Sequence, residues 1–201
     1  MQQKERVKKV LQLLDEHYGT DDICYLEYEN AWQLLIATIL SAQCTDARVN
    51  IVTRDLFQKY RSVEDFAKAD QKELEQDIHA TGFYRNKAKN IISCCQDLMS
   101  RFGGQVPETL EELTSLAGVG RKTANVIRGN IYHEPSIVVD THVKRDLMRV
   151  LPKDHWILYN MQIITLGRQL CKAPNPKCGE CFLTEVCPCY QKNAAQKPEK
   201  K

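Results

Sequence analysis

Leu116-Ala-Gly-Val-Gly-Arg-Lys-Thr-Ala124 has the pattern of two helices joined by a tight glycine turn. A periodic apolar segment ends at Leu116, two glycines one residue apart follow, and a second helical segment begins. Gly118 and Gly120 permit positive φ angles and close backbone approach. The turn amides and the N-terminus of the second helix can then bind a phosphate without reading base sequence. The pattern predicts a phosphate-binding helical hairpin; a plain hairpin whose glycines serve packing is the alternative.

Lys122 falls in the first turn of the second hairpin helix. The electrostatics of a helix N-terminus disfavour a cation there and so favour the neutral amine. A neutral amine can attack C1′ of a sugar and form a Schiff base. Lys122 is therefore a candidate nucleophile, and a phosphate-binding or solvated lysine is the alternative.

Asp140 follows the apolar run Ile137-Val-Val139 and precedes a new helical segment. A carboxylate at this point could stabilise a developing oxocarbenium ion or assist a proton transfer. The same residue type is also a common N-cap. Asp140 is thus a candidate catalytic carboxylate, with helix capping as the alternative.

Four cysteines near the C-terminus follow the pattern C-x6-C-x2-C-x5-C. They are Cys171, Cys178, Cys181 and Cys187. Thiolates at this spacing suit an iron–sulfur cluster or a structural zinc, and the spacing alone leaves both open. Lys172 and Lys177 lie between the first two cysteines, which makes this loop a candidate nucleic-acid contact. Cys189 is a further thiol to which we assign no role.

The composition predicts a globular protein without a membrane span. Hydrophobic residues make up 43% of 201, enough for one large or two small domains with a buried core. No apolar run reaches membrane-span length, and the first residues lack an apolar signal-peptide core. We expect a cytoplasmic protein, where a metal suits the four cysteines better than disulfides.

The net charge of +2 does not exclude nucleic acid, because a local basic patch suffices. Candidate cations for it are Arg121, Lys122, Lys144, Arg145, Lys172 and Lys177.

Helical periodicity runs through nearly the whole chain, and no stretch shows sustained strand alternation. Ser62, Asp70 and Thr109, each with an acidic residue three positions later, predict helix starts. We further expect a strongly buried helix over Trp32–Leu40 and a long helix over Asn86–Phe102. The sequence therefore predicts an all-α fold.

Taken together, these motifs resemble the endonuclease III family of DNA glycosylases. The resemblance rests on the hairpin stretch, on Val139-Asp-Thr-His-Val143 and on the cysteine spacing. Leu40-Ser-Ala-Gln-Cys-Thr-Asp46 is also similar to a family motif. The similarity spans Val7 to Cys187, and four motifs in the correct order are highly specific.

The resemblance implies a two-domain helix-hairpin-helix DNA glycosylase fold with a C-terminal iron–sulfur cluster loop. A helical barrel would span 23–133, a cluster domain would combine 134–190 with the N-terminal helix 1–22, and 191–201 would be a polar tail. The implied activity is removal of oxidised pyrimidines from double-stranded DNA, followed by strand cutting at the abasic site by β-elimination, in base excision repair. DNA with damaged bases or abasic sites would be the partner of a monomeric protein.

The resemblance also implies roles for individual residues. Lys122 would be the Schiff-base nucleophile and Asp140 the essential carboxylate. Gln43 matches the position that fills the hole left by the extruded base. Phe83 falls where the family places an apolar wedge, and an ordinary core aromatic is the alternative. The other implied DNA contacts are Gly118, Gly120, Arg121, Lys172 and Lys177. The ligands of a [4Fe-4S] cluster would be Cys171, Cys178, Cys181 and Cys187.

The chain departs from the family pattern at two places. Ala117 replaces a usual proline before the hairpin turn, which loosens the turn slightly. After Arg145, roughly a helix and a turn are missing, so we expect one short helix, ending near Pro152, to replace two. Because this segment follows Asp140, a catalytically impaired DNA-binding protein of the same fold is the alternative function. A zinc-stabilised helical module with no DNA role is a third hypothesis, and it requires an accidental hairpin match.

Overall fold

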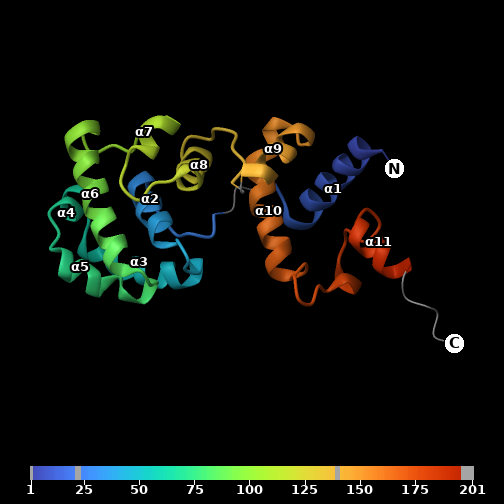
Figure 1. The fold of residues 1–201 in the computed structure, drawn as a ribbon, viewed down its shortest axis with the longest axis horizontal. Helices are drawn as coiled ribbons and strands as arrows, with labels where there is room; N and C mark the ends of the chain where they lie inside the picture. The colour runs from blue at the N-terminus through green and yellow to red at the C-terminus, as the bar shows by residue number, and fades with distance from the viewer. Residues whose placement is uncertain (1, 21–23, 139–140, 196–201) are drawn as a thin grey trace. The chain divides into compact units, whose positions relative to one another are not determined.

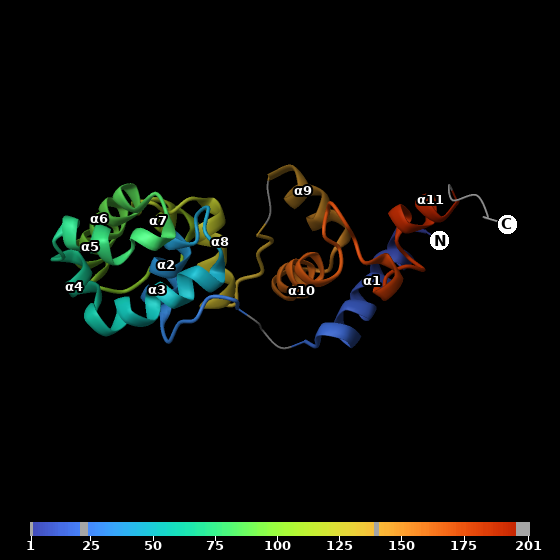
Figure 2. The ribbon, with the colours of Figure 1, turned by 90° about the horizontal axis from the view of Figure 1, so that it is seen from below.

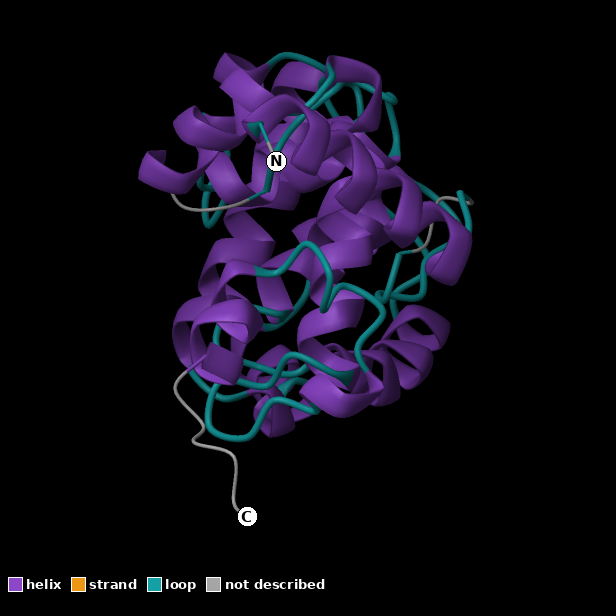
Figure 3. Cartoon of the chain, turned by 90° about the vertical axis from the view of Figure 1, so that its right-hand side faces the viewer, coloured by secondary structure: helices purple, strands orange, loops and turns teal. Residues whose placement is uncertain are grey.

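The structure is a computed structural model that describes residues 2–20, 24–138 and 141–195. Within these ranges every regular element is helical and no strand occurs (Figure 3). The predicted all-α fold is confirmed. No helix in the described ranges is long and apolar enough to cross a membrane. The chain forms two compact units, Cys24–Asp140 and Met1–Ile23 with Thr141–Lys201.

The unit of residues 24–140 is built around one apolar helix. Its elements are α2 (Ala31–Leu40), α3 (Asp46–Lys59), α4 (Val63–Ala67), α5 (Gln71–Asp77), the 3-10 turn η1 (His79–Thr81), α6 (Tyr84–Phe102), α7 (Leu110–Thr114) and α8 (Arg121–Asn130). Helix α2 contacts α3, α6 and α8 (Figures 1 and 2). Every α2 residue from Gln33 to Leu40 is buried. A helix that is apolar on nearly all sides belongs in a core, and α2 lies there.

Side-chain caps set the helix starts that the sequence predicts. Ser62, Asp70 and Thr109 each accept a hydrogen bond from the backbone amide three residues later. Such caps satisfy amides that have no partner inside the helix. The long helix α6 begins two residues before the expected Asn86, because Phe83 takes a left-handed conformation as its N-cap. The three side-chain caps thus set the starts of the short helices α4, α5 and α7, as the sequence predicts.

The second unit joins both ends of the chain. It contains α1 (Gln3–Tyr18), α9 (Thr141–Val150), η2 (Lys153–His155), α10 (Trp156–Gln169), η3 (Cys178–Glu180) and α11 (Pro188–Ala195). Its small apolar core combines Leu14 of α1, Leu166 of α10, and Leu183 and Val186 of the cysteine loop. The loop is therefore part of this core. The Gln162 side chain adds hydrogen bonds to the Asp15 carboxylate and the Gly19 carbonyl.

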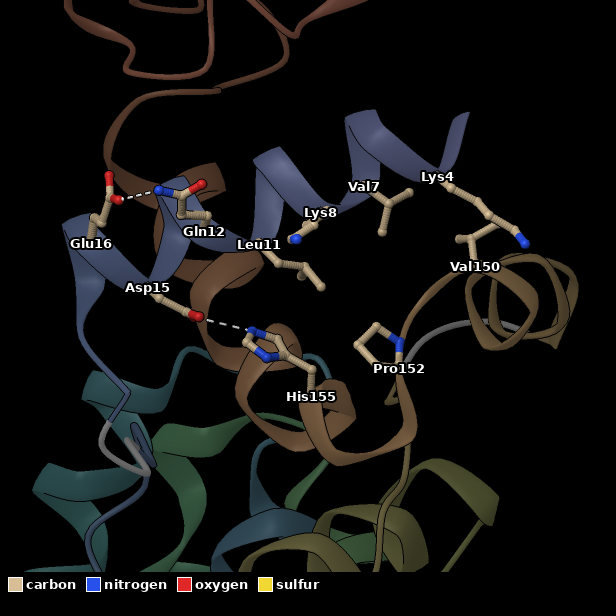
Figure 4. A pocket seen from close by; sticks show the side chains of 10 residues that line it. All are labelled: Lys4, Val7, Lys8, Leu11, Gln12, Asp15, Glu16, Val150, Pro152 and His155. Carbon is tan, nitrogen blue, oxygen red and sulfur yellow. Dashed lines mark hydrogen bonds and ion pairs between the residues drawn. The ribbon is translucent and has the colours of Figure 1, made fainter. Parts of the chain in front are cut away.

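One helix, α9, occupies the segment after position 140, as the sequence predicts. It ends at Val150, and Pro152 follows, as expected from the sequence. Val143 and Met148 of α9 are 52% and 42% exposed. A groove of about 430 Å³ opens between α1 and the turn after α9. In this groove the His155 ring faces the Asp15 carboxylate at 3.1 Å (Figure 4).

The last helix differs from the sequence expectation. We expected a polar tail from residue 191, but α11 continues to Ala195. Pro188 occupies the first position of α11, where its fixed φ favours a helix start. The amide of Gln191 donates to the Cys187 carbonyl at 3.1 Å, which continues the helix into the expected tail.

Candidate functional site

The predicted hairpin is present between α7 and α8, but its two glycines have different conformations. Gly118 has φ +76°, in the left-handed region that glycine tolerates. Gly120 is the N-cap of α8 with φ −87°, a conformation that other residues also adopt. Its carbonyl accepts the first helical hydrogen bond, from Ala124 at 2.9 Å. Only Gly118 carries the tight turn.

Gly118 also lets the hairpin approach helix α6. A Cβ atom added at Gly118 would lie 2.9 Å from Cβ of Asn90 and 3.2 Å from its amide nitrogen. A Cβ added at Gly120 would meet no atom within 4 Å. The turn at Gly118 therefore packs closely against Asn90 of α6. The sequence around Asn90 gives no sign of this contact.

Replacing Gly118 with alanine should destabilise the protein by about 2–4 kcal/mol. The left-handed backbone and the steric overlap with Asn90 both oppose a side chain there. Urea unfolding of the variant and the parent measures the difference. Gly120→Ala is the matched control, and it should cost clearly less because its backbone is extended and its surroundings are open. Equal losses for the two variants would contradict this account of the turn.

Lys122 and Arg121 project from the first turn of α8, and both are exposed. The opposite face of the helix is buried through Ala124 and Ile127. Lys122 lies in the first turn of α8, as the sequence predicts. Its side chain is exposed at the start of the helix that follows the Gly118 turn.

Asp140 lies outside the described residues, but the chain that leads to it is anchored to α8. The hydroxyl of Ser136 donates to the Asn125 carbonyl of α8 at 2.9 Å. Ser136 is 4% exposed, and Ile137 is fully buried. The helix that carries Lys122 and the segment before Asp140 are therefore joined. Sequence reasoning missed Ser136, because a single serine after a proline has no distinctive signal.

Gln43 and Phe83 lie on two loops and share an unusual backbone. Their φ angles are +54° and +49°, which non-glycine residues seldom adopt. Gln43 is exposed in the loop between α2 and α3. Phe83 is 64% exposed, so the alternative of an ordinary core aromatic is wrong. Lys87, which sequence reasoning also missed, contacts the chain segments that lead into both loops.

The cysteine loop gathers five free thiols. Burial raises the pKa of the Cys171 thiol, and negative charge on the other cysteines adds to this effect. The contributing residues are Cys181, Cys187, Cys178 and Cys189. Across the described ranges, no group of three or more His, Cys, Asp or Glu side chains is arranged to hold a metal ion. The soft sulfur donors nevertheless suit iron–sulfur chemistry.

Two lysines lie on the same loop, as the sequence predicts. Lys172 and Lys177 are both exposed. The Lys177 ammonium lies 3.7 Å from the Glu180 carboxylate. The Lys177 backbone amide donates to the Leu170 carbonyl at 2.8 Å, which ties the loop to the end of α10. Both cations are accessible to an anionic partner.

Comparison with known proteins places this arrangement in a family. Residues 36–160 match the model described as "HhH-GPD superfamily base excision DNA repair protein". Endonuclease III of Synechocystis sp. is 44% identical, over 94% of this chain and 94% of that protein. Endonuclease III of Bacillus subtilis is also 44% identical, over 82% of this chain and 84% of that protein.

Solved structures give the same result. A non-covalent endonuclease III–DNA complex superposes with a TM-score of 0.88 at 39% identity, over 98% of this chain and 100% of that one. A trapped covalent endonuclease III–DNA intermediate superposes with a TM-score of 0.87 at 39% identity, over 96% of this chain and 100% of that one. The fold, the motifs and these matches agree over nearly the full length, and the chain belongs to the endonuclease III family of the HhH-GPD superfamily of base excision DNA repair proteins.

Proposed function

We propose that this base excision repair DNA glycosylase and abasic-site lyase uses Lys122 as its nucleophile on oxidised pyrimidines in double-stranded DNA. The observation that carries the proposal is the exposed Lys122 amine in the first turn of α8, beside the Gly118 turn. The turn amides and the N-terminus of α8 bind a DNA phosphate next to it. Arg121 adds a second exposed cation at the same helix start. The sugar is thereby held within reach of the amine.

Lys122 Nζ forms a bond to C1′ while the glycosidic C1′–N bond breaks and the damaged base leaves with the electron pair and a proton. The sugar ring opens to give a Schiff base between Nζ and C1′. A proton then leaves C2′, and the C3′–O bond breaks so that the phosphate departs with the bonding electrons. Water hydrolyses the Schiff base and releases Lys122. Asp140 is proposed to stabilise the positive charge at C1′ or assist proton transfer.

Gln43 and Phe83 are proposed to keep the damaged base out of the stack. The Gln43 amide fills the hole left by the base, and the Phe83 ring enters between base steps. Support comes from their exposure and their left-handed backbones. Such a conformation costs on the order of 1–3 kcal/mol and is typical of functional positions. Extruding the base lets Lys122 reach C1′.

The cysteine loop is proposed to hold the [4Fe-4S] cluster that is typical of the endonuclease III family. Its ligands would be Cys171, Cys178, Cys181 and Cys187. The support is the soft donor set, its spacing C-x6-C-x2-C-x5-C, and the packing of this loop into the core with α1 and α10. Bound there, the cluster would fix the loop so that Lys172 and Lys177 meet a DNA phosphate.

Replacing both Lys172 and Lys177 with alanine should weaken DNA binding and reduce its salt dependence. Each phosphate contact contributes about 0.9 to the slope of log K against log salt, so the slope should fall by about 2. Affinity for an abasic-analogue duplex, measured over a range of salt concentrations, tests this. The exposed pair Lys68 and Lys72, also replaced by alanine, is the matched control. An unchanged slope for the loop variant would exclude the phosphate contact.

We also propose that the protein acts as a monomer, in the cytoplasm and on the nucleoid if its source is bacterial. Its partner is double-stranded DNA that carries damaged bases or abasic sites. The reported relatives are bacterial proteins, which supports this location.

A nicking assay on a duplex with one thymine glycol tests the proposed function. Strand breaks without alkali mean base removal and lyase cutting, which is the expected result. Breaks only after alkali mean base removal alone and contradict the role of Lys122. Binding without any break supports the second candidate, an impaired DNA-binding protein, which the single helix α9 after position 140 favours.

A further inference from the structure

Lys87 is a buried lysine whose ammonium joins two distant parts of the chain. It is 5% exposed, although it lies in the first turn of α6. Its Nζ donates to the Leu40 carbonyl and to the Thr81 carbonyl, each at 2.8 Å. Burial lowers the pKa of the Lys87 ammonium, opposed by the charge of Cys44. Lysine is rarely buried to this extent, so the position requires a structural or functional reason.

The two carbonyls stand just before the loops of Gln43 and Phe83. Leu40 is the last residue of α2, and the loop that carries Gln43 follows it. Thr81 ends η1, and Phe83 comes two residues later. The Lys87 backbone amide also donates to the Phe83 carbonyl at 3.1 Å. One residue therefore contacts the beginnings of both loops.

The Lys87 ammonium joins two loops that lie far apart in the sequence. Helix α2 leaves its last carbonyls without helical partners, and the Lys87 ammonium binds one of them. On the other side Thr81 is 2% exposed and its hydroxyl donates to the Ile78 carbonyl, so this anchor is itself fixed. An apolar side chain at position 87 would leave two buried carbonyls unpaired.

We propose that Lys87 is a positioning residue that sets the distance between Gln43 and Phe83 for entry into damaged DNA. The inference rests on the proposed function, because the DNA roles of those two residues are assigned there. Lys87 is buried and so acts through the loops rather than on the DNA itself. A plug and a wedge must enter the same short stretch of duplex together. Their separation therefore controls how often the damaged base is held out of the stack.

The test compares Lys87→Met with Lys89→Met in thymine glycol removal. Lys89 lies on the same helix and is exposed, so its variant loses the same charge without breaking either contact. Lys87→Met should lower kcat/KM about 100-fold, since a misplacement of about 1 Å can cost that much. Lys89→Met should match the parent. A 2-aminopurine base opposite an abasic analogue should brighten on binding the parent and not on binding Lys87→Met.

A double-mutant cycle separates positioning from a general loss of fold. In a Gln43→Ala/Phe83→Ala background, Lys87→Met should add little further loss, because the groups it places are absent. A full additional loss there would overturn the proposal. If circular dichroism shows that Lys87→Met does not fold, Lys87→Gln, which keeps a shorter hydrogen-bond donor, replaces it in the cycle. The same two outcomes then support or overturn the proposal.

The experiment also distinguishes a failure of the proposed function. If Gln43→Ala/Phe83→Ala itself leaves thymine glycol removal and 2-aminopurine brightening unchanged, the DNA roles of those residues are wrong, and the inference about Lys87 falls with them. If that variant is impaired while Lys87→Met equals Lys89→Met, the proposed function stands and the role of Lys87 alone is overturned.

Discussion

Lys122→Ala is expected to lose strand cleavage at a preformed abasic site by at least about 1,000-fold, because the amine that forms the covalent bond is removed. The side chain is exposed, and the fold does not depend on it. Thermal unfolding and affinity for an abasic-analogue duplex should therefore stay close to those of the parent. Single-turnover nicking of the abasic duplex measures the effect.

Arg121→Ala is the matched control for Lys122→Ala. Arg121 precedes Lys122 in the same turn and is also exposed, so its loss removes a neighbouring cation without removing the amine. We expect weaker binding but normal nicking once the DNA is saturated with protein. A Lys122→Ala protein that cuts at the parental rate would refute the assignment of the nucleophile.

Cys178→Ser is expected to remove iron and acid-labile sulfide and to unfold the unit built from both chain ends. Four buried side chains form the centre of that core, and Leu183 and Val186 belong to the cysteine loop. Burial of each of these four side chains stabilises the unit by about 1.5–3 kcal/mol. A core this small seldom keeps a unit folded without a metal or another cross-link. The melting temperature should fall by about 10 °C or more, since 1 kcal/mol corresponds to about 2–4 °C in a chain of this length.

Cys189→Ser is the matched control for the cluster. Cys189 lies two residues after Cys187, is exposed, and is outside the proposed ligand set. Its variant should keep the iron and sulfide content and the melting temperature of the parent. Zinc without sulfide in the purified parent, or iron loss from both variants alike, would contradict the proposed ligands.

The sequence predicts local features of this fold well because their causes are local. Ser62, Asp70 and Thr109 cap their own helices with groups three residues away, and the caps could be identified from the chain alone. The apolar run before Ser41 likewise predicts a buried helix, which α2 confirms. Lys122 is found at its expected place for the same reason, since glycine turns and helix starts are short-range signals.

The features that sequence reasoning missed depend on contacts between distant residues. Lys87 binds a carbonyl 47 positions away, and Ser136 bonds to a carbonyl on another element. Nothing in the local pattern marks either residue. The left-handed backbone of Phe83 arises where η1 meets α6, and the steric need for Gly118 comes from Asn90 on α6. Such requirements appear only when the helices are packed together.

Borohydride trapping with peptide mapping identifies the residue that forms the covalent bond to the sugar. The parent protein is incubated with a thymine glycol duplex, reduced, and digested, and the DNA-linked peptide is sequenced by mass spectrometry. We expect one covalent adduct per chain, with the sugar remnant on Lys122. An adduct on any other residue, or no adduct from a protein that still binds the duplex, would contradict it.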